Sequence, residues 1–508
     1  MVPLMPKAPL TMIPTKISLL CFLAFLVVSK GTAQTVSARL VDSRTQKGIP
    51  YATVEYGPGQ GVISNGEGRF SFVWEAGTPR PDSIHISSMG YGKKGFALEQ
   101  LGDSLLFLDP SPIELQGVYL FDRDLEVADI IERMVQRLPE NINGSAVKQR
   151  IFLRHSSLTQ LDKLDMGFKE SSIAELDKAL IDSMANSVPR EAQHYTESLL
   201  DLYKNGEKFK LDIIKAAELY NKDQVASLEE LGKRMETIFK ANIKRDSYLK
   251  IKSGLFSQKV QVDSILGSLE GAEKVGAGGQ RDSLSGFLDS QRHLLGELLG
   301  ELYYREDSTL DLIDKPGRYE FELTGYSEID GEGVYVITFA PKRGPADFKG
   351  RLFINIGDFA VVHLDFENTQ RLRNFRLLGI TYREERFAGS ARFVKLPNGR
   401  YDLRFLELTQ GNYLAVDRPL KVVEKNKHVK GRRKQNELSL NLDLRMRPTE
   451  KWELVVFGQE PIDSTAFSNF KEDKRAKASY MPYYDPGFWE GHNIMEPNGA
   501  LRRFKGVE

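Results

Sequence analysis

Cysteine is almost absent: the 508 residues contain one, Cys21, and it lies within an apolar run at residues 17–28 (ISLLCFLAFLVV). A lipoprotein attachment site would have a small residue directly before the cysteine, but Leu20 precedes Cys21, so we expect no lipid there. Beyond this run the chain has no cysteine, which excludes disulfides and thiolate metal sites. Burial of apolar surface must therefore stabilise the protein.

Long hydrophobic runs are also missing. Residues 17–28 are too few to span a bilayer, which takes about 20 apolar residues, and no longer apolar run follows. Lys7 and Lys16 precede the run and the small residues Gly-Thr-Ala follow it, which is the pattern of a secretory signal peptide with its cleavage site. We expect residues 1–33 to be a signal peptide and the rest of the chain to be exported and soluble. A transmembrane anchor is the alternative.

The chain carries no net charge, because 70 Lys and Arg residues balance 70 Asp and Glu residues. Binding of nucleic acid phosphates needs a net basic surface, so the composition argues against nucleic acid as a partner. Catalytic fingerprints are missing as well: no Gly-x-Ser-x-Gly elbow, P-loop or dinucleotide-binding motif follows a predicted strand. We therefore predict that the protein is not an enzyme and has no catalytic residues, no cofactor-binding residues and no cofactor.

One local pattern has the spacing of zinc ligands. His194 and Glu197 form a His-x-x-Glu pair, and His293 is the only candidate for a third ligand in the same region. A catalytic zinc ion needs three protein ligands that leave a fourth position for water. The alternative is chance, in a chain with seven histidines and 70 acidic residues, and we favour it. We predict no metal site.

A second group of charged residues alternates along a predicted strand. His363, Asp365 and Glu367 are two residues apart, so they share one face of that strand. This face is either a charged site or the solvated side of the strand. We expect the solvated side, with the apolar residues between them turned inward.

Basic residues cluster in residues 421–434 (KVVEKNKHVKGRRK), which begin at Lys421 and end at Lys434 and contain seven Lys or Arg and one Glu. This run could make a peripheral contact with anionic lipid headgroups or with the phosphates of lipopolysaccharide. The alternative, which we favour, is a solvated hairpin turn between two strands.

Three periodicities divide the chain after the signal peptide. Residues 35–120 contain short β-like runs separated by turn residues, at the spacing of about 8 to 12 residues typical of a β-sandwich. Residues 124–306 show apolar residues three and four apart, as helices do. Residues 317–460 alternate apolar and polar residues as half-buried antiparallel strands do, and residues 461–508 form an aromatic and polar tail.

The predicted fold class is therefore α+β multi-domain: an N-terminal Greek-key β-sandwich, a central α-helical region and a C-terminal curved antiparallel β-sheet. Asp330-Gly331 and Asn398-Gly399 predict hairpin turns in the sheet. Ser227 and Glu230 have the spacing of a capping box. The expected helices of the central region are at residues 125–139, 173–184, 199–203, 209–220, 227–240 and 283–304.

Three N-terminal segments carry a family resemblance: residues 36–54 (VSARLVDSRTQKGIPYATV), 61–72 (GVISNGEGRFSF) and 84–95 (IHISSMGYGKKG). They resemble the carboxypeptidase regulatory-like domain found in envelope proteins of Bacteroidetes. The resemblance implies a transthyretin-like (prealbumin-like) sandwich. In zinc carboxypeptidases this domain is an accessory module beside a separate catalytic domain, so the resemblance implies no catalysis.

Further along the chain, residues 348–355 (FKGRLFIN), 358–362 (DFAVV) and 488–489 (FW) are similar to uncharacterised Bacteroidetes proteins that carry the same N-terminal domain. This second resemblance implies paired strands of a large sheet and no particular activity. Together the two resemblances imply a protein of the cell envelope, in the periplasm or associated with the outer membrane.

Two functions fit these observations. In the first, which we predict, the protein is non-catalytic and its sandwich is an interaction or structural module for an unknown envelope protein. In the alternative, it is a periplasmic carrier whose C-terminal sheet forms a half-barrel around an apolar lipid or lipoprotein chain. An apolar pocket of about 300 to 1,000 Å³ on the concave face would distinguish the carrier. A metallocarboxypeptidase-related enzyme is the last alternative.

Overall fold

The structure, a computed structural model, describes residues 34–57, 60–74, 82–102, 104–110, 125–254, 256–263, 286–342, 346–427 and 434–506. The predicted signal peptide, residues 1–33, lies outside the described residues, as does the tip of the basic run, residues 428–433. No helix in the part of the chain that the structure describes is long and apolar enough to cross a membrane.

The N-terminal part forms two small sheets with a shared apolar core. One sheet has the strand order β4-β1-β7 and the other the order β3-β2-β5-β6. Leu40, Val54 and Phe72 fill the space between them and are fully buried. The strands are β1 (Gln34–Asp42), β2 (Thr53–Gly57), β3 (Gln60–Ile63), β4 (Arg69–Trp74), β5 (Ser83–Ser88), β6 (Tyr91–Ala97) and β7 (Ser104–Leu108).

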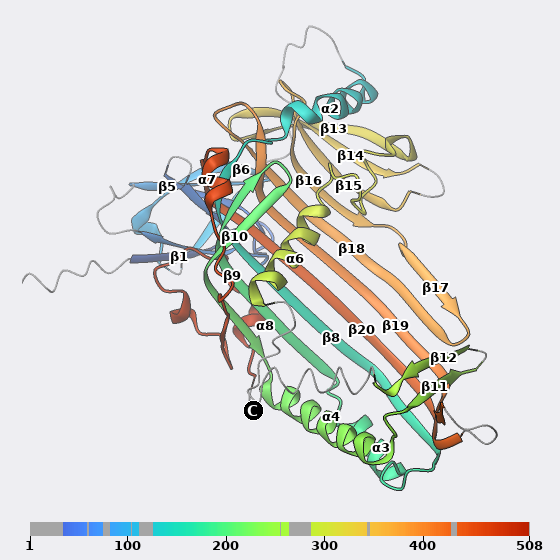
Figure 1. Ribbon diagram of the computed structural model, residues 1–508. Helices are drawn as coiled ribbons and strands as arrows, with labels where there is room; N and C mark the ends of the chain where they lie inside the picture. The colour runs from blue at the N-terminus through green and yellow to red at the C-terminus, as the bar shows by residue number, and fades with distance from the viewer. Residues whose placement is uncertain are drawn as a thin grey trace, which may run out of the picture.

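The rest of the described chain is dominated by one sheet of fourteen strands, with the main order β13-β14-β15-β16-β18-β19-β20-β8-β9-β10-β21 and with β11, β12 and β17 attached beside it. Its strands are β8 (Val147–Ser171), β9 (Glu191–Asn205), β10 (Lys208–Tyr220), β11 (Ser247–Ser253), β12 (Phe256–Gln261), β13 (Tyr319–Ile329), β14 (Glu332–Pro341), β15 (Phe348–Asn355), β16 (Val361–Asn368), β17 (Arg373–Leu377), β18 (Ile380–Lys395), β19 (Tyr401–Asn426), β20 (Lys434–Pro461) and β21 (Ser479–Tyr480). The long neighbours β8, β19 and β20 form its centre (Figure 1).

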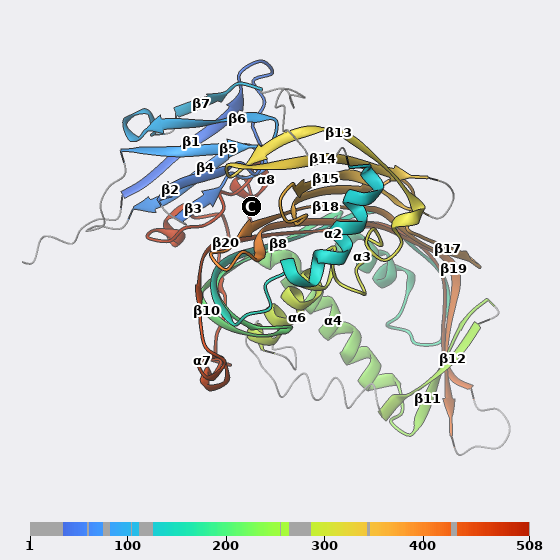
Figure 2. The ribbon, with the colours of Figure 1, turned by 90° about the horizontal axis from the view of Figure 1, so that it is seen from above.

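The longer helices and the small sheets lie on opposite faces of this sheet. Figure 2 shows the sheet curving around α6 (Phe287–Gly300) and α4 (Lys222–Asn242), with the N-terminal sheets on its other side. We call the helix side the inner face. Leu295 of α6 and Ile130 of α2 (Val127–Asn141) pack there against sheet residues such as Leu454, in what we call the main core. The remaining helices are α3 (Lys178–Ser187), α7 (Ser464–Asn469) and α8 (Gly499–Arg502).

The outer face is covered by the N-terminal sheets and by the C-terminal tail. Phe152, Phe405 and Val455 of the large sheet share one apolar cluster with the N-terminal core and with tail residues such as Trp489 and Leu501. We call this cluster the outer core. It joins segments that are hundreds of residues apart in the sequence, so the core between the N-terminal sheets is continuous with apolar residues of the large sheet and the tail.

The predicted fold class is wrong. There is no central helical region in the described residues: β8, β9, β10, β11 and β12 occupy much of the range 124–306 and belong to the large sheet. The segments 199–203 and 209–220, predicted as helices, are strands of the hairpin β9–β10. The predicted separate prealbumin-like domain is wrong as well, because its core continues into the large sheet and the tail.

A β-bulge explains the false helical pattern in β10. The register of β10 against β9 shifts between Ile213 and Lys215, which moves the following side chains to the other face. Leu211 before the shift packs in the main core, whereas Ala217 and Leu219 after it pack in the outer core. Because each face is covered over a different part of the strand, the apolar residues follow a spacing close to that of a helix.

Two smaller predictions have different outcomes. Helix α4 begins with Asn221 as its N-cap, whose side chain accepts a hydrogen bond from the Gln224 N–H, so Ser227 lies within the helix and the predicted capping box is wrong. The hairpin turn predicted at Asp330-Gly331 is confirmed between β13 and β14, and both residues have positive φ angles, 53° and 83°.

Gly350 in β15 gives a stability prediction. A Cβ atom there would lie 2.0 Å from the Asp365 carbonyl oxygen and 2.7 Å from Cζ of Phe339, so alanine would force two strands apart. We expect Gly350→Ala to lower the free energy of unfolding by about 2 kcal/mol in urea denaturation. In the control Gly167→Ala the nearest atom lies at 3.6 Å, and we expect no loss. Equal effects of the two variants would contradict the prediction.

Candidate functional site

The inner face of the long strands changes from a packed core to an open surface along its length. Trp452 and Leu454 of β20 pack into or against the main core. The next inner position, Glu450, accepts a hydrogen bond from the Ser157 hydroxyl at 2.8 Å and lies 2.8 Å from Nε2 of His155. These polar contacts lie between the main core and the rest of the inner face, which continues toward the start of β20 and the end of β8.

Past these polar contacts, apolar side chains line the inner face of the neighbouring strands β8, β19 and β20. The register pairs Leu414 with Met446 and Met446 with Leu161, and directly paired residues share a face. The β19–β20 register has no shift from Phe405 to Val423, so even-numbered residues of both strands remain on the inner face. Arg418 is the charged residue among them; it is buried and donates to the Ser253 carbonyl oxygen. We call this surface the distal apolar face: Leu161, Leu164, Met166 and Phe168 of β8, Leu414, Val416 and Leu420 of β19, and Leu440, Leu442, Leu444 and Met446 of β20.

Most of these side chains remain accessible. Leu161 and Leu440 are buried, but the other members are half-buried. None of them belongs to the main core or to the outer core. The distal apolar face is therefore a surface that the described part of the protein covers only in part.

The opposite face of the same strands is charged. Lys163 forms an ion pair with Asp443 at 2.6 Å, and Arg447 forms one with Asp162 at 2.8 Å. These pairs are partly exposed, so each contributes little to stability. They show that this half of the sheet has one hydrated face, and that the apolar residues are segregated to the inner face.

The apolar surface continues onto β17. Phe375 and Leu377 pair with Tyr382 and Ile380 of β18, which in turn pair with Leu414 and Val416. Phe375 is 49% exposed and Leu377 is 48% exposed. An exposed apolar patch next to a half-buried apolar face is typical of a binding surface.

Helix α4 has apolar residues along one side, and part of this apolar stripe remains exposed. Leu228, Leu231, Met235 and Ile238 are three or four residues apart, so they lie along one side of the helix. Ile238 is buried against α3 and the end of β20, whereas Leu228 is 41% exposed. The stripe is packed at the C-terminal end of α4 and open toward the N-terminal end.

An apolar cavity of about 170 Å³ lies where α3 and α4 meet the sheet. Its walls come from Ile173, Leu176, Met235, Ile238, Phe239, Ile243, Leu249, Val422 and Leu438, with Glu424, Asn436 and Glu437 beside them. Glu424 accepts hydrogen bonds from the Lys244 N–H and the Asn436 amide, both at 2.8 Å. Its carboxylate is thus satisfied within the protein, and the cavity is left with an apolar lining.

The volume of this cavity decides what can enter it. An apolar cavity of roughly 150 Å³ can hold a benzene molecule. The cavity is thus large enough for the end of a hydrocarbon chain but smaller than the roughly 300 Å³ of a typical pocket for a whole ligand. It does not reach the volume of about 300 to 1,000 Å³ expected from the sequence for a carrier's pocket on the concave face. The longer part of such a chain would have to lie on the distal apolar face.

The zinc-like residues are not brought together. His194 and Glu197 lie on β9, where residues three apart point to opposite faces, and the ring of His194 contacts that of Tyr220. His293 lies on α6 with its side chain 77% exposed and near Glu297. Among the described residues no group of three or more His, Cys, Asp or Glu side chains is placed to hold a metal ion.

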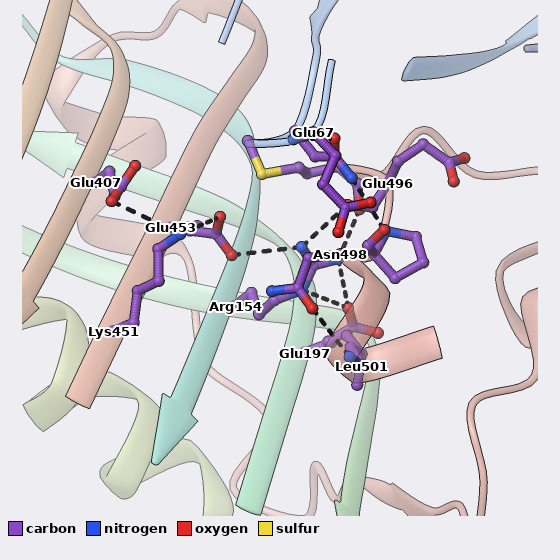
Figure 3. A network of polar contacts seen from close by, with 12 residues as sticks. Glu67, Arg154, Glu197, Glu407, Lys451, Glu453, Glu496, Asn498 and Leu501 are labelled. Carbon is purple, nitrogen blue, oxygen red and sulfur yellow. Dashed lines mark hydrogen bonds and ion pairs between the residues drawn. The ribbon is translucent and has the colours of Figure 1, made fainter. Parts of the chain in front are cut away.

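Glu197 instead belongs to a buried ionic network on the outer face (Figure 3). Its carboxylate accepts hydrogen bonds from Nε of Arg154 at 2.7 Å and from the Trp489 indole at 2.9 Å. Arg154 also forms an ion pair with Glu453 at 3.4 Å and donates to the Met495 carbonyl at 2.6 Å. Burial opposes its charge, yet the two carboxylates raise the pKa of Arg154. The network fastens the tail to the sheet.

His363 is not on a solvated face, which corrects the expectation for this strand. It is 3% exposed on β16, and its Nε2 lies 2.9 Å from Oδ1 of Asp365. Burial lowers the pKa of His363, so its ring is neutral at pH 7. Asp365 is partly exposed and Glu367 exposed. The N-terminal sheets cover this part of the outer face, and for this reason the alternation alone could not show the burial.

Three of the four basic residues in the described part of the basic run form ion pairs with nearby acids. Lys434 forms an ion pair with Glu437 at 2.5 Å, and Lys421 pairs with Glu437 and with Glu170. Lys427 lies 3.4 Å from Asp263. These residues end β19 and begin β20, while the predicted turn at residues 428–433 lies outside the described range.

No protein family profile matches this sequence, and no curated protein matches it. Among solved structures, a domain described as an outer membrane lipoprotein-sorting protein from Vibrio parahaemolyticus has 8% identity, covers 67% of this chain and 97% of its own, and has a TM-score of 0.20. A LolA superfamily protein from Nitrosomonas europaea has 9% identity, 68% and 98% coverage and a TM-score of 0.16. A DUF1329 family protein from Desulfovibrio piger has 10% identity, 65% and 92% coverage and a TM-score of 0.17. TM-scores this low do not establish a shared fold.

Proposed function

We propose that this protein is an exported, non-catalytic carrier that holds the hydrocarbon chain of a lipid or lipoprotein on the distal apolar face. The observation that carries the proposal is how side chains are distributed in the distal part of β8, β19 and β20, where the distal apolar face lies. Half-buried apolar residues line the inner face around one buried arginine, Arg418, whose guanidinium donates to the Ser253 carbonyl oxygen. Ion-paired charged residues line the outer face. Exposure of an apolar face of a sheet to water is unfavourable, and an apolar ligand that covers this face removes the cost.

The shape of the surface supports a chain-like ligand. The stripe from Leu438 to Met446 covers eight residue steps of β20, or about 27 Å at a rise of 3.4 Å per residue. It ends at the 170 Å³ cavity, which includes Leu438 in its wall. A long, narrow apolar surface with a closed end fits an extended acyl chain whose end enters the cavity.

The affinity for a fluorescent 18-carbon fatty acid tests this proposal. Ile238→Phe adds three carbon atoms to the wall of the cavity. We expect it to weaken binding of the probe about tenfold, because the chain end loses apolar burial of about 1.4 kcal/mol. The cavity offers space for the three added carbon atoms, so the midpoint of thermal unfolding should stay the same or rise. Fluorescence titration and a thermal scan measure both quantities.

Ile214→Phe is the matched control. Ile214 lies at the bulge of β10 and is 39% exposed, so the same substitution there leaves the cavity unchanged. We expect wild-type affinity for this variant. Equal affinity of the wild type and of Ile238→Phe would contradict the role of the cavity, and absence of binding by the wild type would contradict the carrier function.

A second function has one observation in its favour. Leu105 and Phe107 alternate along β7 and are 53% and 38% exposed, so this strand offers an apolar surface to another protein. An interaction module of the regulatory-like kind, as the sequence predicts, would use this surface. Crosslinking from intact cell envelopes would identify such a partner, and a Leu105→Ser and Phe107→Ser double variant should lose the crosslink.

A further inference from the structure

A second, larger cavity lies between the N-terminal sheets and the outer face of the large sheet, away from the distal apolar face. Its volume is about 580 Å³, within the range of small-molecule sites. The N-terminal side contributes residues of β2, β3, β5 and β6, and the opposite side contributes the β13–β14 turn and parts of β16, β18, β19 and β20. Figure 2 shows these two groups of strands facing each other. We call this cavity the intersheet cleft.

Arg392 of β18 lines the intersheet cleft, where Asp365 and Asp330 act on its charge but do not form an ion pair with it. Among the described residues its guanidinium makes no ion pair, and its Nε is buried without a hydrogen-bond partner. Arg154, the other deeply placed arginine of the outer face, has two carboxylates and two carbonyl oxygens as partners. Arginine remains charged at any ordinary pH, so an unpaired buried guanidinium costs free energy that an anion would remove.

His363 lies directly beside Arg392. The two residues are cross-strand partners in β16 and β18, so their side chains leave the sheet on the same side, about 5 Å apart at their Cβ atoms. Nε2 of His363 contacts Asp365, but Nδ1 is buried and has no partner within the described chain. Burial keeps the ring neutral by lowering the pKa of His363, so Nδ1 is an unused acceptor.

Other charged groups line the cleft beside Arg392 and His363. Arg404 donates to the carbonyl oxygens of Phe457 and Gly61, each at 3.2 Å, and forms no ion pair within the described residues. Lys93 pairs with Glu55 at 3.3 Å, and Glu328 and Asp330 are the remaining carboxylates in the lining. Lys395 is held by Glu332 and Asp358. Within the described residues neither arginine forms an ion pair with Glu328 or Asp330, so both guanidinium groups remain without a direct anionic partner.

We propose that the intersheet cleft binds a small hydroxylated molecule with an oxyanion group, either a carboxylate or a phosphate. The oxyanion accepts hydrogen bonds from the guanidinium of Arg392, and a neighbouring hydroxyl group of the ligand donates to Nδ1 of His363. Met89, Ile329 and Val362 in the lining contact the carbon skeleton. This site is separate from the proposed carrier surface and its existence does not depend on that function.

Thermal unfolding and calorimetric titration of the full chain test the site with defined probes: glycerol 3-phosphate, glycerate and inorganic phosphate, against chloride at equal ionic strength. We expect glycerol 3-phosphate and glycerate to raise the unfolding midpoint and chloride to leave it unchanged. Phosphate without the hydroxylated skeleton should bind more weakly. Vesicles of phosphatidylglycerol separate a lipid headgroup from a free ligand; binding to vesicles alone would overturn the small-molecule proposal.

The decisive variant is Arg392→Leu. We expect it to weaken binding of glycerol 3-phosphate at least tenfold and, without ligand, to unfold at the same temperature as the wild type or higher, because no partner is left unpaired. Arg475→Leu is the control, since its side chain is 90% exposed in the tail, and it should bind as the wild type does. Wild-type binding by Arg392→Leu would overturn the proposal, as would failure of every probe to bind the wild type.

Discussion

Replacing Arg154 by methionine is expected to lower the free energy of unfolding by about 3 to 5 kcal/mol. The substitution removes the guanidinium but leaves Glu197 and Glu453 buried, with exposed side-chain fractions of 0% and 3%. Glu453 keeps Lys451 as a partner at 3.1 Å, whereas Glu197 keeps only the indole of Trp489. An uncompensated carboxylate in the interior accounts for most of the expected loss. Urea denaturation at pH 7 measures it.

Arg150→Met is the control for Arg154→Met. Both residues lie on β8 and point to the outer face, but the side chain of Arg150 is 46% exposed and its partner Asp201 keeps Lys148 at 3.3 Å. We expect a loss of under about 1 kcal/mol for this control. The prediction would fail if the two variants lost the same stability.

Loss of Arg154 should also release the tail. Its guanidinium donates to the main-chain carbonyls of Met495 and Glu496, which hold the tail against β8. We expect residues 481–506 of Arg154→Met to be cut by protease under conditions in which the wild type resists. A tail that stays protected would show that apolar contacts of the outer core are sufficient to hold it.

The turns were readable from the sequence because their chemistry is local. Asp330-Gly331 and Asn398-Gly399 both form hairpin connections, and Gly399 has a φ of 80°. The two-residue turn at Asp330-Gly331 needs residues that tolerate positive φ whatever lies around it, and Gly399 meets the same need in the longer loop between β18 and β19. The alternation of residues 439–444 likewise showed one apolar and one polar face, and the structure places the even-numbered residues of this segment on the inner face.

The rest depends on pairings between distant segments. β8 was assigned to a helical region, yet it pairs along almost its whole length with β20, about 290 residues away. Arg154 meets Glu453 only because of this pairing, so no local spacing could predict their network. One signal was available: Arg154 follows the apolar residues Ile151, Phe152 and Leu153, where a lone charge indicates a buried partner.

The burial of His363 and the position of Arg392 in the intersheet cleft could not be predicted from the sequence either. Strand alternation predicts which residues share a face, but it cannot predict what covers that face. The N-terminal sheets cover the outer face near β16 and β18. At the distal end of β8, β19 and β20, the inner face is covered only in part by the described residues. The candidate sites arise from this unequal covering of one continuous sheet.

The carrier proposal predicts its largest effect at Leu444, in the middle of the distal apolar face. We expect Leu444→Asp to weaken binding of the fluorescent 18-carbon fatty acid about 100-fold, or about 2.7 kcal/mol. The substitution removes leucine contacts with the chain and requires the new carboxylate to lose water when the chain binds. Leu444 is half-buried without ligand, so the carboxylate can stay hydrated in the free protein and the fold should persist. Fluorescence titration measures the affinity and circular dichroism checks the fold.

Asn441→Asp separates this effect from simple charge repulsion. Asn441 lies on the outer face of the same strand and is exposed, and the substitution adds the same charge. If the chain lies along the inner face, Asn441→Asp binds the probe as the wild type does. Equal weakening by both variants would mean that long-range charge, not contact, governs binding. Weakening by Ile238→Phe without weakening by Leu444→Asp would confine the ligand to the cavity, and the strands beyond it would then need another reason for their apolar face.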